Sequence, residues 1–159
     1  MTFQTSDLCD KYDNTVQVLT PLLHSFGGTN RCFGQIVTCK LPDHNYTLKQ
    51  LLQTSGDGKV CVVDVNAKFT AVVGDTLMAF AAQNNWAGII INGYVRDTIN
   101  TKKINVALFA LGTCPKKTQL EKKGVLGETL HFAGVDFCDG DFLYADEDGI
   151  ITSKEMLYM

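Results

Sequence analysis

The chain has 159 residues, with 14 Lys and Arg against 17 Asp and Glu, and a formal net charge of −3. The length predicts a single domain spanning residues 1–159. No basic stripe of the kind that binds nucleic acid phosphates accompanies this charge, and no apolar run approaches the roughly 18 residues of a membrane span. We therefore expect a globular protein that binds neither nucleic acid nor membrane directly.

Six cysteines are present, and none forms a Cys-x-x-C pair with another. The N-terminus lacks the apolar segment of a signal peptide, and a chain of this length can fold without disulfide cross-links. Cys39 and Cys61 lie inside apolar runs, where a thiol behaves as a small hydrophobic group. We therefore expect reduced thiols and a cytoplasmic protein.

In chain order, the first expected element is a short helix that begins near Thr5 and is capped by a short polar side chain. Strands are then expected over residues 33–40, 60–65, 89–91 and 107–111, and helices over residues 47–53, 74–85 and 98–103. The strands after residue 59 are almost entirely apolar, which is typical of parallel strands covered on both faces. After residue 127, strand-like pieces alternate with glycine-containing turns. The sequence therefore predicts an α/β fold with a βαβ-rich middle and antiparallel β segments at both ends.

The expected helix over residues 74–85 begins with Gly74, Asp75, Thr76 and Leu77. A helix N-terminus carries free N–H groups and a partial positive charge, so the N–H groups of Thr76 and Leu77 could hold a carboxylate. Asp is also a preferred N-cap residue. Asp75 is therefore either a cap or part of a site, and the sequence favours neither.

Arg96 and Asp97 follow the expected strand and a turn at Gly93. Adjacent opposite charges are usually an exposed loop pair of little energetic consequence. These two, however, lie at the carboxyl end of a βαβ unit, where ligands bind in open α/β sheets. A guanidinium suits carboxylate or enolate oxygens, and Mg²⁺ needs only one or two protein carboxylates. The pair is thus a candidate for anion and metal binding.

Two further charged patterns are interpreted as structural. The acidic segment at residues 141–149 lacks the first ligand of an EF-hand loop because Tyr144 stands there, so we expect a hairpin turn rich in Asp and Gly. Three lysine pairs are interpreted as solvated surface rather than an RNA site: Lys102 and Lys103, Lys116 and Lys117, and Lys122 and Lys123.

Several motifs together carry a resemblance that covers nearly the whole chain. They are TSDLCDKY at residues 5–12, KVCVVDV at 59–65, VVGDTL at 72–77, NGYVRD at 92–97 and HFAGVDFCDGDFLYADEDGII at 131–151. On these residues the chain resembles the regulator of ribonuclease activity A family, which is related to the class II 4-hydroxy-4-methyl-2-oxoglutarate aldolases. The resemblance implies a swivelling β/β/α domain that assembles as a homotrimer, sometimes paired into a hexamer.

The resemblance also implies a lyase: a divalent-metal-dependent aldolase or oxaloacetate decarboxylase that acts on 2-oxo acids through a pyruvate enolate. In that case Arg96 binds the substrate and stabilises the enolate, Asp97 ligates Mg²⁺ or Mn²⁺ directly, and Asp75 acts through a bound water. The backbone binds the substrate carboxylate at Gly74, Thr76 and Leu77. Three places after the Arg–Asp pair, where family aldolases tend to have an acid, this chain has Asn100.

The alternative implied by the same resemblance is a protein without chemistry of its own. Such a protein binds and inhibits a ribonuclease E-type endonuclease, or an RNA helicase, and so regulates RNA turnover. The intact Gly74–Asp75 and Arg96–Asp97 pairs favour the enzyme. The expected partners are thus a small 2-oxo acid in the first case and an RNA-processing protein in the second.

Overall fold

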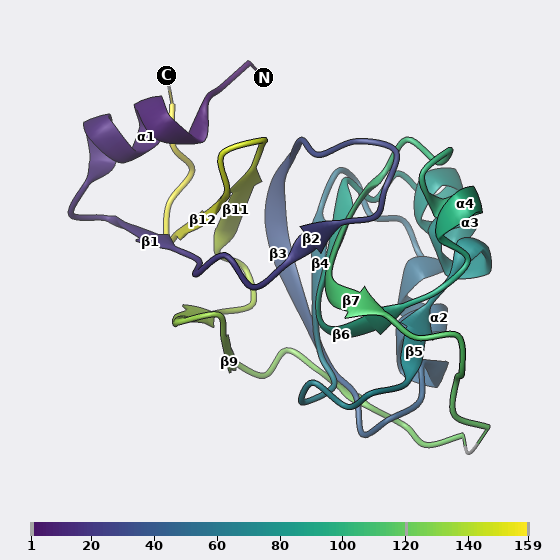
Figure 1. The fold of residues 1–159 in the computed structure, drawn as a ribbon. Coiled ribbons are helices and arrows are strands. Elements are labelled where there is room, and N and C mark those ends of the chain that lie inside the picture. The colour runs from purple at the N-terminus through teal and green to yellow at the C-terminus, as the bar shows by residue number, and fades with distance from the viewer. Residues whose placement is uncertain (1, 120, 159) are drawn as a thin grey trace.

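The computed structural model describes residues 2–119 and 121–158. The helices are α1 (Thr5–Tyr12), α2 (Tyr46–Leu52), α3 (Asp75–Gln83) and α4 (Thr98–Thr101). In Figure 1, α2, α3 and α4 lie on one side of a large twisted sheet, and α1 lies with both termini at the opposite end. In the described part of the chain, no helix combines the length and apolar character needed to cross a membrane.

Parallel strands form the middle of the sheet, as the apolar runs predict. In sheet order they are β3 (Cys32–Lys40), β4 (Val60–Asp64), β6 (Gly88–Val95) and β7 (Ala107–Thr113). The short strand β5 (Ala71–Val73) also pairs in parallel with β6. The connections between these strands carry α2, α3 and α4, which is the expected βαβ arrangement.

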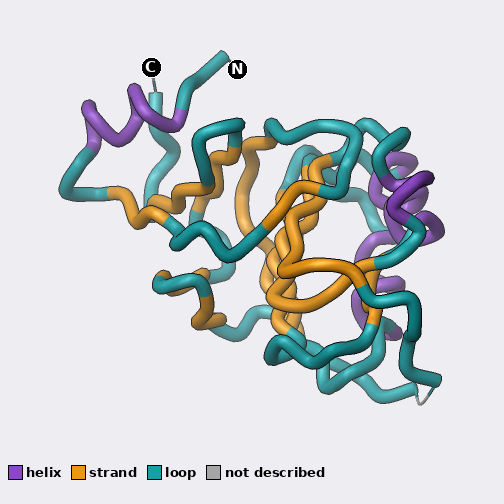
Figure 2. Tube along the Cα trace, viewed as in Figure 1, coloured by secondary structure: helices purple, strands orange, loops and turns teal. Residues whose placement is uncertain are grey.

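Antiparallel strands extend the sheet beyond β3 and β7 (Figure 2). On the β3 side they are β11 (Phe142–Ala145), β12 (Ile150–Ser153) and β1 (Val16–Val18), together with β8 (Val125–Leu126). On the β7 side lies β2 (His24–Ser25), and β9 (Leu130–Phe132) with β10 (Val135–Phe137) forms a separate hairpin. The prediction of an α/β fold with antiparallel segments is confirmed, and so is the hairpin turn between β11 and β12.

Both faces of the parallel strands are buried, which explains their continuous apolar sequence. Along β4, Cys61 and Val63 pack toward α2 and α3, whereas Val60 and Val62 pack on the opposite face with the β9–β10 hairpin. All six cysteines are free thiols, as expected. Burial raises the pKa of Cys39 to about 12, so this thiol is a structural group.

Helix α1 is fixed to the sheet by an acid from the β11–β12 turn. The residue that precedes the helix is Gln4, and no side chain caps it, so the prediction of a short polar cap near Thr5 is wrong. Thr5 instead donates from its backbone N–H to Asp146 Oδ2 at 2.7 Å and from its hydroxyl to Asp146 Oδ1 at 2.6 Å. Asp148 N–H donates to the same carboxylate at 3.0 Å. The acidic segment thus serves the packing of α1.

Candidate active site

Strand β5 leads directly into helix α3, with Gly74 between them. Gly74 is the N-cap residue in an extended conformation, Asp75 is the first helical residue, and no side chain caps the helix. The cap alternative for Asp75 is therefore wrong. Among the described residues, the backbone N–H groups of Thr76 and Leu77 have no hydrogen-bond partner. They are available to an anion at the positive end of the helix.

Arg96 lies beside this helix start because strand β6 runs alongside β5 and continues past Gly93. The predicted turn at Gly93 is therefore wrong. A Cβ atom at Gly93 would lie 2.4 Å from Val65 Cγ1, so close packing and not a turn requires glycine there. The Arg96 N–H donates to the Val73 carbonyl at 2.9 Å, which sets the end of β6 against the end of β5.

Asp97 has a left-handed backbone conformation, with φ 58° and ψ 36°, and is the N-cap residue of α4. Its carbonyl accepts from Asn100 N–H at 2.9 Å and from Thr101 N–H at 3.0 Å. The Thr101 hydroxyl in turn donates to the Phe26 carbonyl at 2.7 Å and anchors this short helix. A left-handed conformation costs a residue other than glycine about 1–2 kcal/mol. Such strain is concentrated at ligand sites, where the surrounding structure holds it in place.

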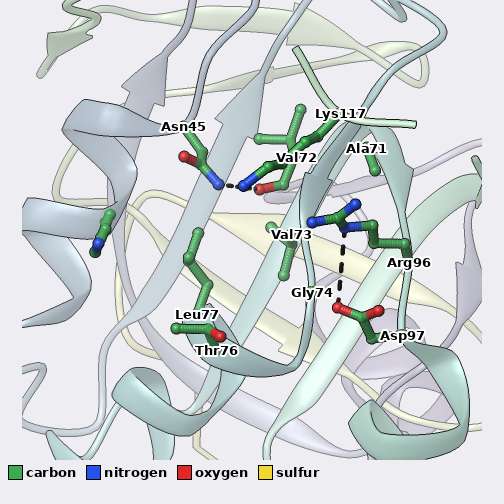
Figure 3. Close-up of a pocket in the computed structure, with 11 residues that line it drawn as sticks. Asn45, Ala71, Val72, Val73, Gly74, Thr76, Leu77, Arg96, Asp97 and Lys117 are labelled. Carbon is green, nitrogen blue, oxygen red and sulfur yellow. Dashed lines mark hydrogen bonds and ion pairs between the residues drawn. The ribbon is translucent and has the colours of Figure 1, made fainter. Parts of the chain in front are cut away.

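The side chains of Arg96 and Asp97 face one another at the rim of the helix start (Figure 3). Asp97 Oδ2 lies 3.9 Å from Arg96 Nε and accepts from Asp75 N–H at 3.4 Å. The two side chains are 34% and 39% exposed. A Cβ atom on Gly74 would lie 2.5 Å from Asp97 Oδ2, so glycine is needed for the carboxylate to approach the helix.

These elements enclose a cavity of about 160 Å³ (Figure 3). It is lined by Asn45, Lys49, Ala71, Val72, Val73, Gly74, Thr76, Leu77, Arg96, Asp97 and Lys117. The volume corresponds to about five water molecules at their share of liquid volume. The cavity is therefore suited to a small organic acid rather than to a large cofactor.

Five of the six predicted site residues line this cavity, and Asp75 does not. Asp75 turns to the neighbouring surface, where its Oδ2 accepts from Asn100 Nδ2 at 2.9 Å. Its backbone N–H still touches the carboxylate of Asp97. The acid is thus adjacent to the cavity but does not line it.

Three polar residues that line the cavity were not predicted: Asn45, Lys49 and Lys117. Asn45, the residue before α2, donates from Nδ2 to the Val72 carbonyl of β5 at 2.8 Å. No pattern in the sequence predicts this contact. Lys117 belongs to a pair that we interpreted as solvated surface. It lies 20 positions after Asp97 in the chain, and only the path of the loop brings it back to the cavity.

The Aldolase/RraA family, described as RraA-like, matches residues 5–152. The chain belongs to this family. A Bacillus cereus relative, named provisionally as a 4-hydroxy-4-methyl-2-oxoglutarate aldolase, is 43% identical over 98% of this chain and 99% of its own. A relative with the same name from Dechloromonas aromatica is 38% identical over 99% of each chain.

Two solved structures share the whole fold. The RNA-processing inhibitor RraA from Thermus thermophilis has a TM-score of 0.93 and 34% identity, covering 99% of this chain and 96% of that chain. A Geobacillus kaustophilus protein named as S-adenosylmethionine:2-dimethylmenaquinone methyltransferase has a TM-score of 0.93 and 34% identity, covering 98% and 97%. The names of these family members differ while the fold does not, so function has to be argued from the site.

Proposed function

We propose that this protein is a divalent-metal-dependent lyase that cleaves small 2-oxo acids. Its reactions are the retro-aldol cleavage of 4-hydroxy-4-methyl-2-oxoglutarate and the decarboxylation of oxaloacetate. The observation that carries the proposal is the placement of a helix N-terminus, Arg96 and Asp97 around one small cavity. The names of relatives that are 38% and 43% identical support the aldol reaction.

The chain offers separate groups for the two ends of a pyruvyl unit. The carboxylate accepts from the free N–H groups of Thr76 and Leu77, where the helix dipole favours negative charge. The guanidinium of Arg96 faces the 2-oxo oxygen, on which negative charge develops during bond cleavage. Arg96 is itself steadied by a hydrogen bond from Nη1 to the Pro115 carbonyl at 3.3 Å.

The residues fit a divalent ion that takes most of its ligands from substrate and water. Asp97 Oδ1 has no hydrogen-bond partner among the described residues, and the side chain is 39% exposed. In the described part of the chain, no group of three His, Cys, Asp or Glu side chains could hold a metal. Mg²⁺ is commonly held by one or two carboxylates with substrate oxygens and water, a donor set that Asp97 matches. A bound ion of this kind polarises the 2-oxo group as a Lewis acid.

Both reactions break the bond between C3 and C4 and leave its electron pair on the pyruvyl fragment as an enolate. Arg96 stabilises the enolate oxygen, and the helix start holds the carboxylate in place as charge moves. The retro-aldol reaction also removes the proton of the C4 hydroxyl, and both reactions end when enolate C3 takes up a proton. Asp75, held by Asn100 beside the cavity, exchanges these protons through a water.

An oxaloacetate decarboxylation assay with Mg²⁺ or Mn²⁺, repeated in EDTA, tests the proposal. We expect EDTA to abolish turnover, and Arg96→Ala and Asp97→Ala each to lower kcat/KM by about 100-fold or more. Arg31→Ala is the matched control, because Arg31 pairs with Glu147 at 2.9 Å and does not line the cavity. Turnover that survives the chelator, or is unaffected by either site substitution, refutes the mechanism.

A second function is favoured by the near-complete match to a protein named as an RNA-processing inhibitor. We propose that the chain, as a homotrimer, also binds a ribonuclease E-type endonuclease or an RNA helicase and slows RNA cleavage. One fold can carry both activities. A pull-down combined with an RNA cleavage assay tests this: we expect a stable complex and dose-dependent slowing, and the absence of both contradicts it. Sedimentation analysis tests the homotrimer.

A further inference from the structure

Helix α4 has four residues, and Thr101 is the one among them that is buried. Its exposed fraction is 0%, and its hydroxyl donates to the Phe26 carbonyl at 2.7 Å. We propose that this hydroxyl is a positioning group for Asp97, the proposed metal ligand at the start of the same helix. The inference rests on the proposed function, because it names the contact that holds the ligand of that function in place.

A helix as short as α4 does not hold its shape by itself. The first turn of a helix fixes several backbone angles for a single hydrogen bond, so short helices depend on packing. Ile99 is 79% exposed and does not pack on the core. The Asn100 side chain contacts only Asp75, in an exposed hydrogen bond. The bonds that the Asn100 and Thr101 N–H groups donate to the Asp97 carbonyl therefore depend on the buried anchor.

The carbonyl that accepts from Thr101 belongs to a segment fixed by the sheet. Strand β2 pairs with β7, and the N–H of Phe26, which follows β2, donates to the Leu108 carbonyl at 2.8 Å. The Gly28 N–H donates to the Ile104 carbonyl at 2.8 Å, and a Cβ atom at Gly28 would clash with that carbonyl. The Phe26 carbonyl is thus held against β7, and the Thr101 hydroxyl ties α4 to that position.

Asp97 needs such an anchor because its backbone conformation is strained. Its φ of 58° and ψ of 36° are left-handed, and a residue other than glycine keeps these angles only where the surrounding structure imposes them. The Thr101 N–H donates to the Asp97 carbonyl at 3.0 Å and closes the turn. The Asp97 carboxylate then accepts from the Asp75 N–H at 3.4 Å. Loss of the anchor is therefore expected to displace this carboxylate while the sheet remains intact.

Amide hydrogen exchange on the metal-free protein tests the anchor directly. Thr101→Val keeps the shape of the side chain and removes the hydroxyl. We expect the amides at positions 100 and 101 to lose about tenfold of their protection in Thr101→Val, the effect of losing one hydrogen bond, and the amides of β4 to keep theirs. Thr101→Ser retains the hydroxyl and is expected to restore the protection.

Mn²⁺ binding tests the consequence at the site, with the EPR signal of the free ion as the readout and pyruvate present. We expect Thr101→Val to weaken Mn²⁺ binding by about tenfold or more, because contacts that orient a metal ligand commonly contribute that much to affinity. Thr101→Ser is expected to bind Mn²⁺ as wild-type protein does. At saturating Mn²⁺, kcat for oxaloacetate is expected to stay near the wild-type value, so that the loss lies in metal affinity.

Ser153→Ala is the matched control. The Ser153 hydroxyl is also buried and donates to a backbone carbonyl, that of Glu155, at 2.6 Å. It lies on β12, outside the cavity lining. Its loss is expected to leave Mn²⁺ binding, and the exchange of the α4 amides, unchanged.

The outcomes separate this inference from the proposed function. If wild-type protein and Asp97→Ala bind Mn²⁺ alike, Asp97 is not the metal ligand and the proposed function fails, whereas the exchange measurement still decides whether Thr101 positions Asp97. Protection lost only in α4 in Thr101→Val, and recovered in Thr101→Ser, supports the inference. Unchanged protection overturns it, as does loss throughout the sheet or an equal loss in Thr101→Ser. Unchanged Mn²⁺ binding in Thr101→Val, where Asp97→Ala abolishes it, also overturns it.

Discussion

Replacing Gly74 with Ala is expected to separate the stability of the fold from the integrity of the site. The added Cβ would lie 2.5 Å from Asp97 Oδ2, and its next neighbours are Asp97 Cγ at 3.5 Å and Arg96 Cγ at 3.6 Å. The backbone at Gly74, with φ −134° and ψ −164°, is extended and open to any residue. Only the end of the Asp97 side chain therefore has to move.

The expected change in stability is small. Rotating the Asp97 carboxylate away from its preferred rotamer costs about 0.5–1.5 kcal/mol. Replacing Gly with Ala at a compatible position stabilises by about 0.4–1 kcal/mol, because the unfolded chain loses freedom. Since these terms oppose one another, the free energy of unfolding changes by less than about 1 kcal/mol. A carboxylate displaced by about 1 Å is nevertheless expected to lower kcat/KM about 100-fold, or about 2.7 kcal/mol of transition-state stabilisation.

Urea denaturation and the metal-dependent oxaloacetate assay measure the two quantities on the same protein. Gly112→Ala is the control, because its Cβ would lie 3.4 Å from Tyr94 Cε1, an ordinary contact outside the cavity. Near-wild-type turnover by Gly74→Ala would show that the position of Asp97 is not required. A loss of more than about 3 kcal/mol in unfolding free energy would show that the backbone, and not the side chain, absorbs the clash.

Two further predictions concern the fold. Burial alone would raise the pKa of Asp146, but hydrogen bonds from Thr5 hold it below its usual value. The stability that these bonds contribute to the fold is fully present above about pH 4 and is lost as the pH falls further. Thr5→Val is therefore expected to lower the free energy of unfolding by about 1–2 kcal/mol at pH 7 and by less near pH 3, and a penalty independent of pH contradicts this. Gly93→Ala forces a Cβ to within 2.4 Å of Val65 Cγ1 and is expected to cost about 1–3 kcal/mol. A double-mutant cycle with Val65→Ala is expected to recover part of that loss, and strict additivity refutes the clash.

The central strands and the main helix could be predicted because their signals are local. The apolar run in β4 places buried side chains on both faces of a parallel strand. The apolar stripe of helix α3 includes the buried Leu77 and Met78. Only the ends of α3 differ, with Gln83 as the last residue in place of residue 85. Helix ends depend on capping and tertiary contacts that the periodicity does not contain.

The errors occur where a distant residue decides the local conformation. Thr5 binds Asp146, which follows it by 141 positions, and so its hydroxyl is not available as a cap. Gly93 has the local character of a turn residue, yet it is the one residue small enough for β6 to pass Val65. In both cases the local preference was plausible, and packing overrode it.

The residues of the candidate site likewise fall into those that local patterns identify and those that depend on distant contacts. Gly74, Arg96 and Asp97 could be found because strand ends and helix starts in a βαβ unit meet at one edge of the sheet. Lys117 could not, because it lies in a loop whose path is set by the hydrogen bond from Ala71 to the Lys116 carbonyl. Asn45 acts through a backbone carbonyl on another element. Such contacts have no signature in spacing or composition.

Two features of this site are costs to the protein without ligand. Asp97 holds a left-handed backbone conformation, and the N–H groups of Thr76 and Leu77 have no partner within the described chain. An anionic ligand relieves the second of these costs, because it accepts hydrogen bonds from the free N–H groups. Ligand that binds only the folded state adds directly to stability, so a small carboxylate at the start of α3 is expected to stabilise this corner of the fold.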